Sequence, residues 1–369
     1  MSSDVAVRER RLSAELVAGQ IDAVMRTWDM PDEARADAVE IMVETDLRGI
    51  DSHGISMLPI YGRGRADGFL NMTARPTVVR DRPAMAVLDN GGGLGYHAGK
   101  RAMAMAVDKA KQIGIGAVAV RNSNHFGAAG AYALRAAEAG CIGIVTTNAL
   151  NRALVPTRSK QKLFGTNPIA FAAPARDERP FVLDMATTTV AVGKLKLKWL
   201  AGLPMPAGWV VDGDGQPETD ATRAFGAEQR VADDIGLTPL GGLAETSSHK
   251  GYGLSAMVEI LSATLSGATF IATRFASGQQ TTDIGHFFMA IDPAAFREPG
   301  EFEADMDEMI RTLRGLTPVD PAEPVLVPGD PEAISVADRK RNGVPIPDKL
   351  WAQVRDLCAD CGAPFIWNE

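Results

Sequence analysis

The sequence of 369 residues lacks any long apolar run. No window approaches the roughly 20 consecutive apolar residues that a membrane-spanning helix needs. The first ten residues, Met-Ser-Ser-Asp-Val-Ala-Val-Arg-Glu-Arg, contain no apolar core of the kind found in secretory signal peptides. We therefore expect a globular, cytoplasmic protein without a membrane partner. A hydrophobic content of 46% allows a large core, and the length favours two domains over one.

Cysteine is also scarce, and acidic residues outnumber basic ones. Three cysteines cannot form a disulfide framework, which agrees with a reducing compartment. We interpret Cys358 and Cys361 as residues of a terminal helix, because a lone CxxC is a weak signal for zinc or redox chemistry. The net charge of −8 argues against nucleic acid and anionic membranes as partners. We expect a small-molecule partner and no metal site, since no HExxH motif is present.

Hydrophobic periodicity changes along the chain. Residues 12–28, 32–47 and 57–70 have helical periodicity, whereas from residue 75 short apolar runs alternate with Ala-rich helical stretches. This alternation is typical of an α/β sheet layer. Helical periodicity returns at 251–265, 302–313 and 348–357, and 321–331 is Pro-rich and predicted to be extended. We predict a mainly helical domain from residues 1–75 and 251–369, with an α/β domain inserted at 76–250.

The G-x-G-x-x-G fingerprint of common dinucleotide-binding domains is missing. Asn90 to Tyr96 is Gly-rich but has the wrong spacing, and we interpret it as a tight turn. Two other segments, 164–168 and 184–189, place small polar groups and free backbone N–H groups at strand or helix boundaries. Such positions can bind the ribose and phosphates of a dinucleotide, although helix capping would use the same residue types. Lys250 follows a Ser-Ser-His sequence at a helix start, where an anion could dock.

Two of the five histidines lie in polar turns bounded by glycine. Asp51-Ser52-His53-Gly54 follows a predicted helix, and Asn122-Ser123-Asn124-His125-Phe126-Gly127 follows an apolar run that resembles a buried strand. Polar groups at the end of such a strand are where α/β folds place their chemistry. Ser52, His53 and the distant Asp184 could also form a hydrogen-bonded relay. The residues alone leave hydrolysis and proton transfer coupled to hydride transfer both open.

Six motifs in one order resemble the type-2 malate/L-lactate dehydrogenase family. They are Asp51-Ser52-His53-Gly54, the segment 122–127, Gly165-Thr166-Asn167-Pro168, Asp184-Met185-Ala186-Thr187, the segment 249–254 and Gly285-His286-Phe287-Phe288. The family also includes sulfolactate and ureidoglycolate dehydrogenases and cyclic-imine reductases. The resemblance implies an α/β fold like that of L-sulfolactate dehydrogenase, in which a mixed sheet that is not a Rossmann domain binds NAD or NADP. It also implies a homodimer.

The resemblance assigns roles residue by residue. His125 corresponds to the acid/base that exchanges a proton with the substrate, and an alternative account uses Ser52, His53 and Asp184 as a relay. Residues at the family's cofactor positions are Asn148, Thr166, Asn167, Met185, Ala186, Thr187, Lys250, Gly329 and Asp330, the last with Asp in place of Glu.

The sequence departs from the family pattern at three places. Met57 replaces an Arg that would bind the substrate carboxylate. Arg48 is our favoured substitute for this role, with Arg63 as the other candidate, and Tyr61 is a second expected substrate-binding residue. The turn at 148–151 and the loop at 157–162 also differ, which leaves NAD and NADP both open, and Arg158, Lys160 and Lys162 could meet a 2′-phosphate.

We expect an NAD(P)-dependent oxidoreductase that acts on the CH–OH group of a small 2-hydroxy acid and forms the 2-oxo acid. A His near pH 7 suits the required proton exchange. The first alternative is reduction of a cyclic imino acid such as piperideine- or pyrroline-2-carboxylate. Two others are a hydrolase using Ser52 and His53, and an inactive binding protein, which the presence of both histidines argues against.

Overall fold

The computed structural model describes residues 9–149, 151–226, 230–273 and 283–367. A seven-stranded mixed sheet forms its centre, in the order β2-β3-β4-β11-β5-β6-β7. Its strands are β2 (Thr77–Asp81), β3 (Met85–Asp89), β4 (Ile115–Ser123), β5 (Ile142–Thr147), β6 (Ile169–Ala173), β7 (Phe181–Met185) and β11 (Ile284–Ile291). Among the described strands only β3 and β4 pair in parallel; the other pairs of this sheet are antiparallel. The predicted α/β mixed sheet is thus confirmed.

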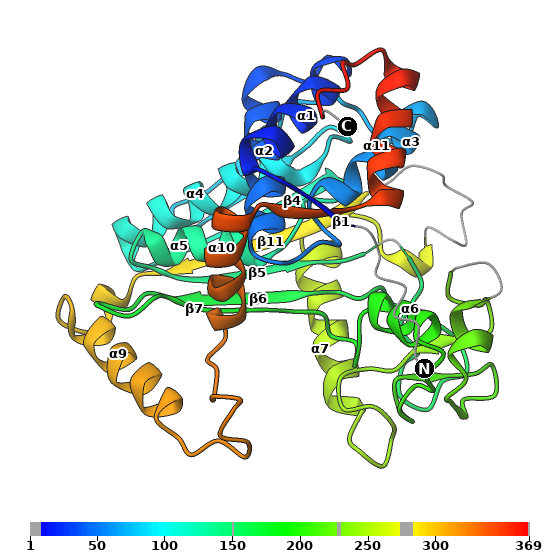
Figure 1. Cartoon of the computed structure of the whole chain (residues 1–369). Helices are drawn as coiled ribbons and strands as arrows, with labels where there is room; N and C mark the ends of the chain where they lie inside the picture. The colour runs from blue at the N-terminus through cyan, green and yellow to red at the C-terminus, as the bar shows by residue number, and fades with distance from the viewer. Residues whose placement is uncertain (1–8, 150, 227–229, 274–282, 368–369) are drawn as a thin grey trace.

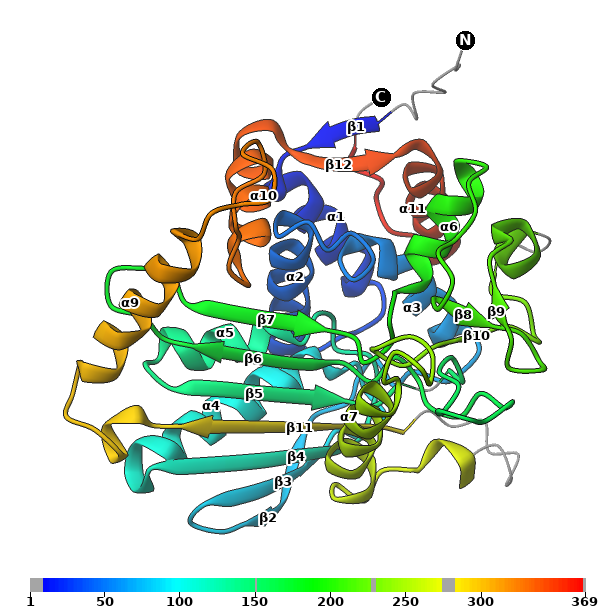
Figure 2. The same ribbon diagram turned by 90° about the horizontal axis from the view of Figure 1, so that it is seen from below.

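Helices cover the two faces of this sheet unequally. One face carries α1 (Ala14–Arg26), α2 (Asp32–Leu47), α4 (Gly95–Ile113) and α5 (Gly130–Glu138), as Figure 1 shows. The other face is crossed at one end by α7 (His249–Glu259) and the π-helical turn η3 (Ile260–Thr264), which Figure 2 shows from below. The predicted helices at 32–47 and 251–265 therefore form, although η3 widens the second one.

The remaining elements flank the sheet. The helices are α3 (Leu58–Ala66), α6 (Val192–Leu200), α9 (Glu301–Arg314), α10 (Asp330–Asn342) and α11 (Asp348–Cys361), with shorter turns at η1 (Ile55–Met57), η2 (Thr222–Gly226) and η4 (Pro293–Ala295). A small sheet joins β8 (Val210–Val211), β9 (Pro217–Glu218) and β10 (Gly236–Leu237), and β1 (Glu9–Leu12) pairs with β12 (Val344–Pro347), so the two ends of the described chain meet. Within the described residues no helix is long and apolar enough to cross a membrane.

The main core joins the N-terminal helices to the sheet. Ile21 and Ile41 of the first two helices, Val118 and Phe288 of the sheet and Trp351 of α11 belong to one cluster of buried side chains. The structure also differs from the predicted domain division at β11, which lies in the middle of the sheet although 251–369 is predicted to be mainly helical. Six of the eight β11 residues are buried, so the strand lacks the alternation that identifies a half-buried strand in a sequence.

Candidate active site

The turn that carries Ser52 and His53 is built on a buried carboxylate. Asp46, in the last turn of α2, accepts a hydrogen bond from the Ile55 backbone N–H at 2.9 Å. A Cβ at position 54 would overlap this carboxylate, so only Gly54 fits here. Burial raises the pKa of Asp46 to about 7. The turn holds Ser52 Oγ 2.7 Å from His53 Nδ1.

The second predicted turn lies directly beside the first. His125 follows the end of β4, and its ring centroid lies 5.3 Å from that of His53. His125 Nδ1 is 2.6 Å from the Tyr61 hydroxyl and receives the Gly127 backbone N–H at 3.3 Å. Burial, then the nearby His53 and His286, lower the pKa of His125 to about 3. Two motifs more than 70 residues apart thus meet as a pair of imidazoles, of which His125 is neutral at pH 7.

A cavity of about 290 Å³ opens between α2, α5 and the ends of β6 and β7. Seven of the predicted site residues border it: Arg48, Ser52, His53, Thr166, Asp184, Met185 and Ala186. Small residues at 127–131, around the start of α5, form another wall. A pocket of this size with a few polar groups in an apolar lining is the usual form of a small-molecule site.

Two acids and one cation set the charge of this cavity. Burial raises the pKa of Asp184 to about 6. Two neighbours oppose this rise and lower the pKa: the Gly130 N–H, which donates to Asp184 Oδ2 at 2.7 Å, and the positive charge of Arg48. Glu332, at the start of α10, borders the cavity and raises the pKa of Asp184 further. No hydrogen bond joins Asp184 to His53 within the residues that the structure describes, so the contacts of a complete Ser-His-Asp triad are not formed.

Arg48 borders this cavity. It caps the C-terminus of α2, its side chain is 13% exposed, and its guanidinium lies 3.9 Å from Glu44. Arg63 is exposed and borders a different cavity, between α3 and α11. The structure therefore separates the two candidates and places Arg48 in the same cavity as His53; His125 contacts the His53 ring but is not among the residues that border this cavity. Met57 packs against the main core.

Three of the predicted cofactor residues point into the protein. The amide groups of Asn148 and Asn167 donate to the Glu259 carboxylate at 3.4 and 3.0 Å, and Thr187 Oγ1 donates to the Asn167 carbonyl at 3.0 Å. Asn167 has a left-handed backbone with φ +38°. Burial raises the pKa of Glu259. These side chains are not among the residues that border the cavity, whereas Thr166 and Ala186, their neighbours in the chain, do border it.

The other three lie away from this cavity's lining. Lys250 is exposed on the first turn of α7, and Gly329 is the N-cap of α10 with φ +103°. Asp330 binds Arg314 at 2.7 Å, and this contact above all lowers the pKa of Asp330 to about 2. Its neighbour Glu332 reaches the cavity instead, a residue that the sequence analysis does not predict.

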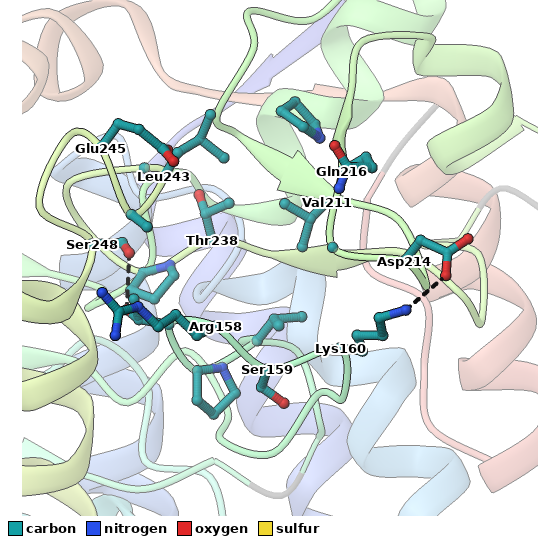
Figure 3. Close-up of a pocket in the computed structure, with 18 residues that line it drawn as sticks. Arg158, Ser159, Lys160, Val211, Asp214, Gln216, Thr238, Leu243, Glu245 and Ser248 are labelled. Atoms are coloured by element: carbon teal, nitrogen blue, oxygen red, sulfur yellow. Dashed lines mark hydrogen bonds and ion pairs between the residues drawn. The ribbon is translucent and has the colours of Figure 1, made fainter.

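The basic loop at 157–162 borders a second cavity of about 430 Å³. Figure 3 shows Arg158 on the same side as Ser248, while Lys160 reaches across to Asp214 at 3.0 Å. Lys162 lies 3.5 Å from the Ala232 carbonyl. Lys160 is therefore already paired with a carboxylate, which leaves Arg158 as the cation of this loop best placed for an anionic ligand.

Sequence reasoning also misses the buried polar groups behind His125. His286, in β11, is fully buried between Ser123 Oγ at 2.9 Å from Nε2 and Thr147 Oγ1 at 2.7 Å from Nδ1. Its ring stacks on Phe126 with centroids 4.4 Å apart and planes 4° apart. The motif at 285–288 is the only sequence signal for it, because nothing local indicates which strand faces the His125 loop.

Comparisons with known proteins agree on one family. Residues 12–355 match the family described as malate/L-lactate dehydrogenase. The chain is 39% identical to a malate dehydrogenase of Pyrococcus abyssi over 341 residues, which are 92% of this chain and 91% of the relative. It is 35% identical to an L-sulfolactate dehydrogenase of Methanocaldococcus jannaschii over 342 residues, 92% of this chain and 94% of the relative.

Solved structures give the same result. The crystal structure of malate dehydrogenase from Entamoeba histolytica superposes with a TM-score of 0.89 at 31% identity, covering 98% of this chain and 100% of that one. A delta1-piperideine-2-carboxylate reductase from Pseudomonas syringae pvar. tomato superposes with a TM-score of 0.80 at 28% identity, covering 94% of this chain and 99% of that one.

Proposed function

Because the chain belongs to the malate/L-lactate dehydrogenase family, we propose that it is an NAD(P)-dependent oxidoreductase that interconverts a small 2-hydroxy acid and its 2-oxo acid. The observation that carries the proposal is the single cavity in which Arg48, His53 and Asp184 meet predicted cofactor residues. It combines a cation for a carboxylate with imidazole groups for proton exchange, which is what this reaction requires.

The cavity fits the nicotinamide half of the cofactor. Thr166, Met185 and Ala186 form one side and the small residues 127–131 another, and we propose that the flat nicotinamide ring lies between them. A bound nicotinamide would supply or accept the hydride. We propose a binding mode unlike that of a Rossmann domain, supported by the absence of the glycine fingerprint and by the largely antiparallel pairing of the described strands.

We assign the proton exchange at the substrate oxygen to His125. Its Nδ1 is already hydrogen-bonded inside the protein, so Nε2 is the nitrogen left for a substrate. His53 borders the cavity, and its ring lies next to the ring of His125. His53, the alternative proton donor, would therefore act at nearly the same place. Arg48 would hold the substrate carboxylate and thereby orient the reacting carbon.

We also propose a homodimer. Its support is an apolar row across the sheet face that α7 covers only at one end (Figure 2). Neighbouring strands place these partly exposed residues side by side: Met85, Ala117, Met289, Ile144, Phe171 and Leu183. An exposed apolar surface of this kind is usually covered by a partner.

A cytoplasmic location is supported by the three cysteines, all free in the structure.

A substrate screen tests the proposed function. Purified protein is incubated with 2-hydroxy acids and NAD or NADP, and in reverse with 2-oxo acids and the reduced cofactors, and nicotinamide absorbance is followed. We expect turnover with at least one acid in each direction. Absence of turnover with every acid, together with covalent labelling of Ser52 by a serine-hydrolase probe, would reject the proposal in favour of hydrolysis.

The second candidate function is reduction of a cyclic imino acid. The similarity to the delta1-piperideine-2-carboxylate reductase structure favours it. The same imidazole would then protonate nitrogen instead of oxygen. Piperideine-2-carboxylate and pyrroline-2-carboxylate in the same screen separate the two functions.

A further inference from the structure

The Tyr61 hydroxyl lies between His125 and a second tyrosine. Its oxygen is 2.6 Å from His125 Nδ1 and 2.8 Å from the Tyr96 hydroxyl. Both tyrosines are buried, with 2% and 1% of their surface exposed. Tyr61 comes from α3 and Tyr96 from the first turn of α4, so two helices converge on one nitrogen of the imidazole.

The backbone decides where the protons of this group lie. The Gly127 N–H can only donate, and it points at His125 Nδ1 at 3.3 Å. This contact favours an unprotonated Nδ1 in the neutral ring, with the hydrogen on Nε2. The Tyr61 hydroxyl then also donates to Nδ1, and its oxygen accepts from Tyr96. The Gly127, Tyr61 and Tyr96 hydrogens then each have an acceptor, and the hydrogen bonds run in one consistent direction towards Nδ1.

We propose that Tyr61, supported by Tyr96, is a positioning residue that fixes His125 in the tautomer with hydrogen on Nε2 and directs that nitrogen to the substrate. The catalytic meaning of this arrangement rests on the proposed role of His125 as the acid/base. For Nε2 to give its hydrogen to the substrate, Nδ1 must first take up a proton from solvent; the imidazolium then loses the Nε2 hydrogen and keeps the one on Nδ1. The Tyr61 hydroxyl can accept that Nδ1 hydrogen, because a hydroxyl accepts as well as donates. The ring is thus held in one orientation in both protonation states.

Two observations separate this role from the substrate contact that the sequence predicts for Tyr61. First, the hydroxyl is already hydrogen-bonded to both His125 and Tyr96. Second, burial raises the pKa of Tyr61 well above its usual value, so the phenol stays protonated. Tyr61 therefore does not supply the reaction with a proton of its own.

The tautomer can be measured directly, without substrate or cofactor. Protein labelled with ¹⁵N-histidine gives ring-nitrogen signals for five residues, and loss of one set in His125→Gln identifies His125. We expect a protonated Nε2 and an unprotonated Nδ1 in the unchanged protein, and a mixture of tautomers in Tyr61→Phe. A dominant Nδ1–H tautomer in the unchanged protein would overturn the proposal, whatever reaction the enzyme catalyses.

Kinetics test the consequence for the reaction. Tyr61→Phe should lower kcat by about 10-fold or more with little change in cofactor KM, and Tyr96→Phe should have a smaller effect in the same direction. Loss of a donor to the neutral ring should also raise the pKa that controls kcat/KM. The matched control is Tyr132→Phe, which removes a buried hydroxyl bonded to the Phe126 carbonyl and not to His125.

The outcomes separate the two proposals. An unchanged pH profile in Tyr61→Phe, or an equal shift in Tyr132→Phe, would reject the positioning role. If the tautomer is the expected one but no hydroxy, oxo or imino acid is turned over, the proposed function fails and the hydrogen-bond assignment stands.

Discussion

Replacing Arg48 with Met should weaken binding of an acid substrate and leave the cofactor site intact. Arg48 is the cation of a cavity that also contains Asp184 and Glu332. A substrate carboxylate that loses this partner is left partly buried beside two acids, a change that typically costs about 2–5 kcal/mol. At 1.4 kcal/mol for each factor of ten, a loss of about 3 kcal/mol corresponds to a rise in KM of roughly 150-fold.

The assay compares KM for the best substrate of the screen with cofactor affinity, measured separately by quenching of protein fluorescence. Arg63→Met is the matched control, because it makes the same substitution at an exposed residue of another cavity, and its KM should not change. The variant should also have a higher pKa at Asp184, which Arg48 lowers. A kinetically silent Arg48→Met, or an equal effect of Arg63→Met, would refute the assignment of the carboxylate site.

Other predictions concern His125, assembly, Asp46 and Met57. His125→Ala should lower kcat by roughly 100-fold or more at unchanged cofactor affinity, and near-normal turnover would transfer the proton exchange to His53. Light scattering should give twice the 39.2 kDa chain mass, and a fully active monomer at micromolar concentration would contradict the dimer. Because burial raises the pKa of Asp46 from 3.8 to about 7, the folded state holds this proton more tightly than the unfolded chain, so Asp46 costs stability as the pH rises from about 4 to about 7. The free energy of unfolding of Asp46→Asn should therefore rise relative to that of the unchanged protein as the pH increases, by at most roughly 4 kcal/mol. Denaturant titrations at several pH values measure this difference, and the same pH dependence in both proteins would reject the prediction. Met57→Arg should widen activity towards malate-like or lactate-like acids, and an unchanged substrate profile would show that position 57 does not reach the substrate.

Local patterns in the sequence predict much of this fold. The helices at 32–47 and 348–357 form within a few residues of their predicted bounds, because each has a clear apolar period. β5 and β6 form from two of the short apolar runs that follow residue 75. β11 and α10 are not predicted. β11 is buried on both faces and lacks alternation, while only one α10 residue, Asp330, is buried, so no apolar stripe marks that helix.

The candidate site follows the same division between local and long-range information. Motifs predict that Ser52, His53 and Asp184 take part, and the structure brings all three to one cavity. The partners of these residues depend on tertiary packing: Tyr61 reaches His125 from 64 residues away, and Glu332 enters the cavity from a helix that the sequence does not reveal. No local pattern encodes such pairings, since each side chain looks ordinary in its own segment.

Asn148 and Asn167 show why a motif residue need not touch the ligand. Both amides donate to Glu259, a carboxylate with 3% of its surface exposed, for which no cation contact is found among the described residues. A buried carboxylate is stable only when hydrogen bonds satisfy it, so the two asparagines and Glu259 require one another. Their joint effect is to hold the backbone at 165–168, including the left-handed Asn167, in the shape that turns Thr166 towards the cavity. The motif thus shapes the cavity through backbone geometry, and the amide groups themselves are already hydrogen-bonded to Glu259.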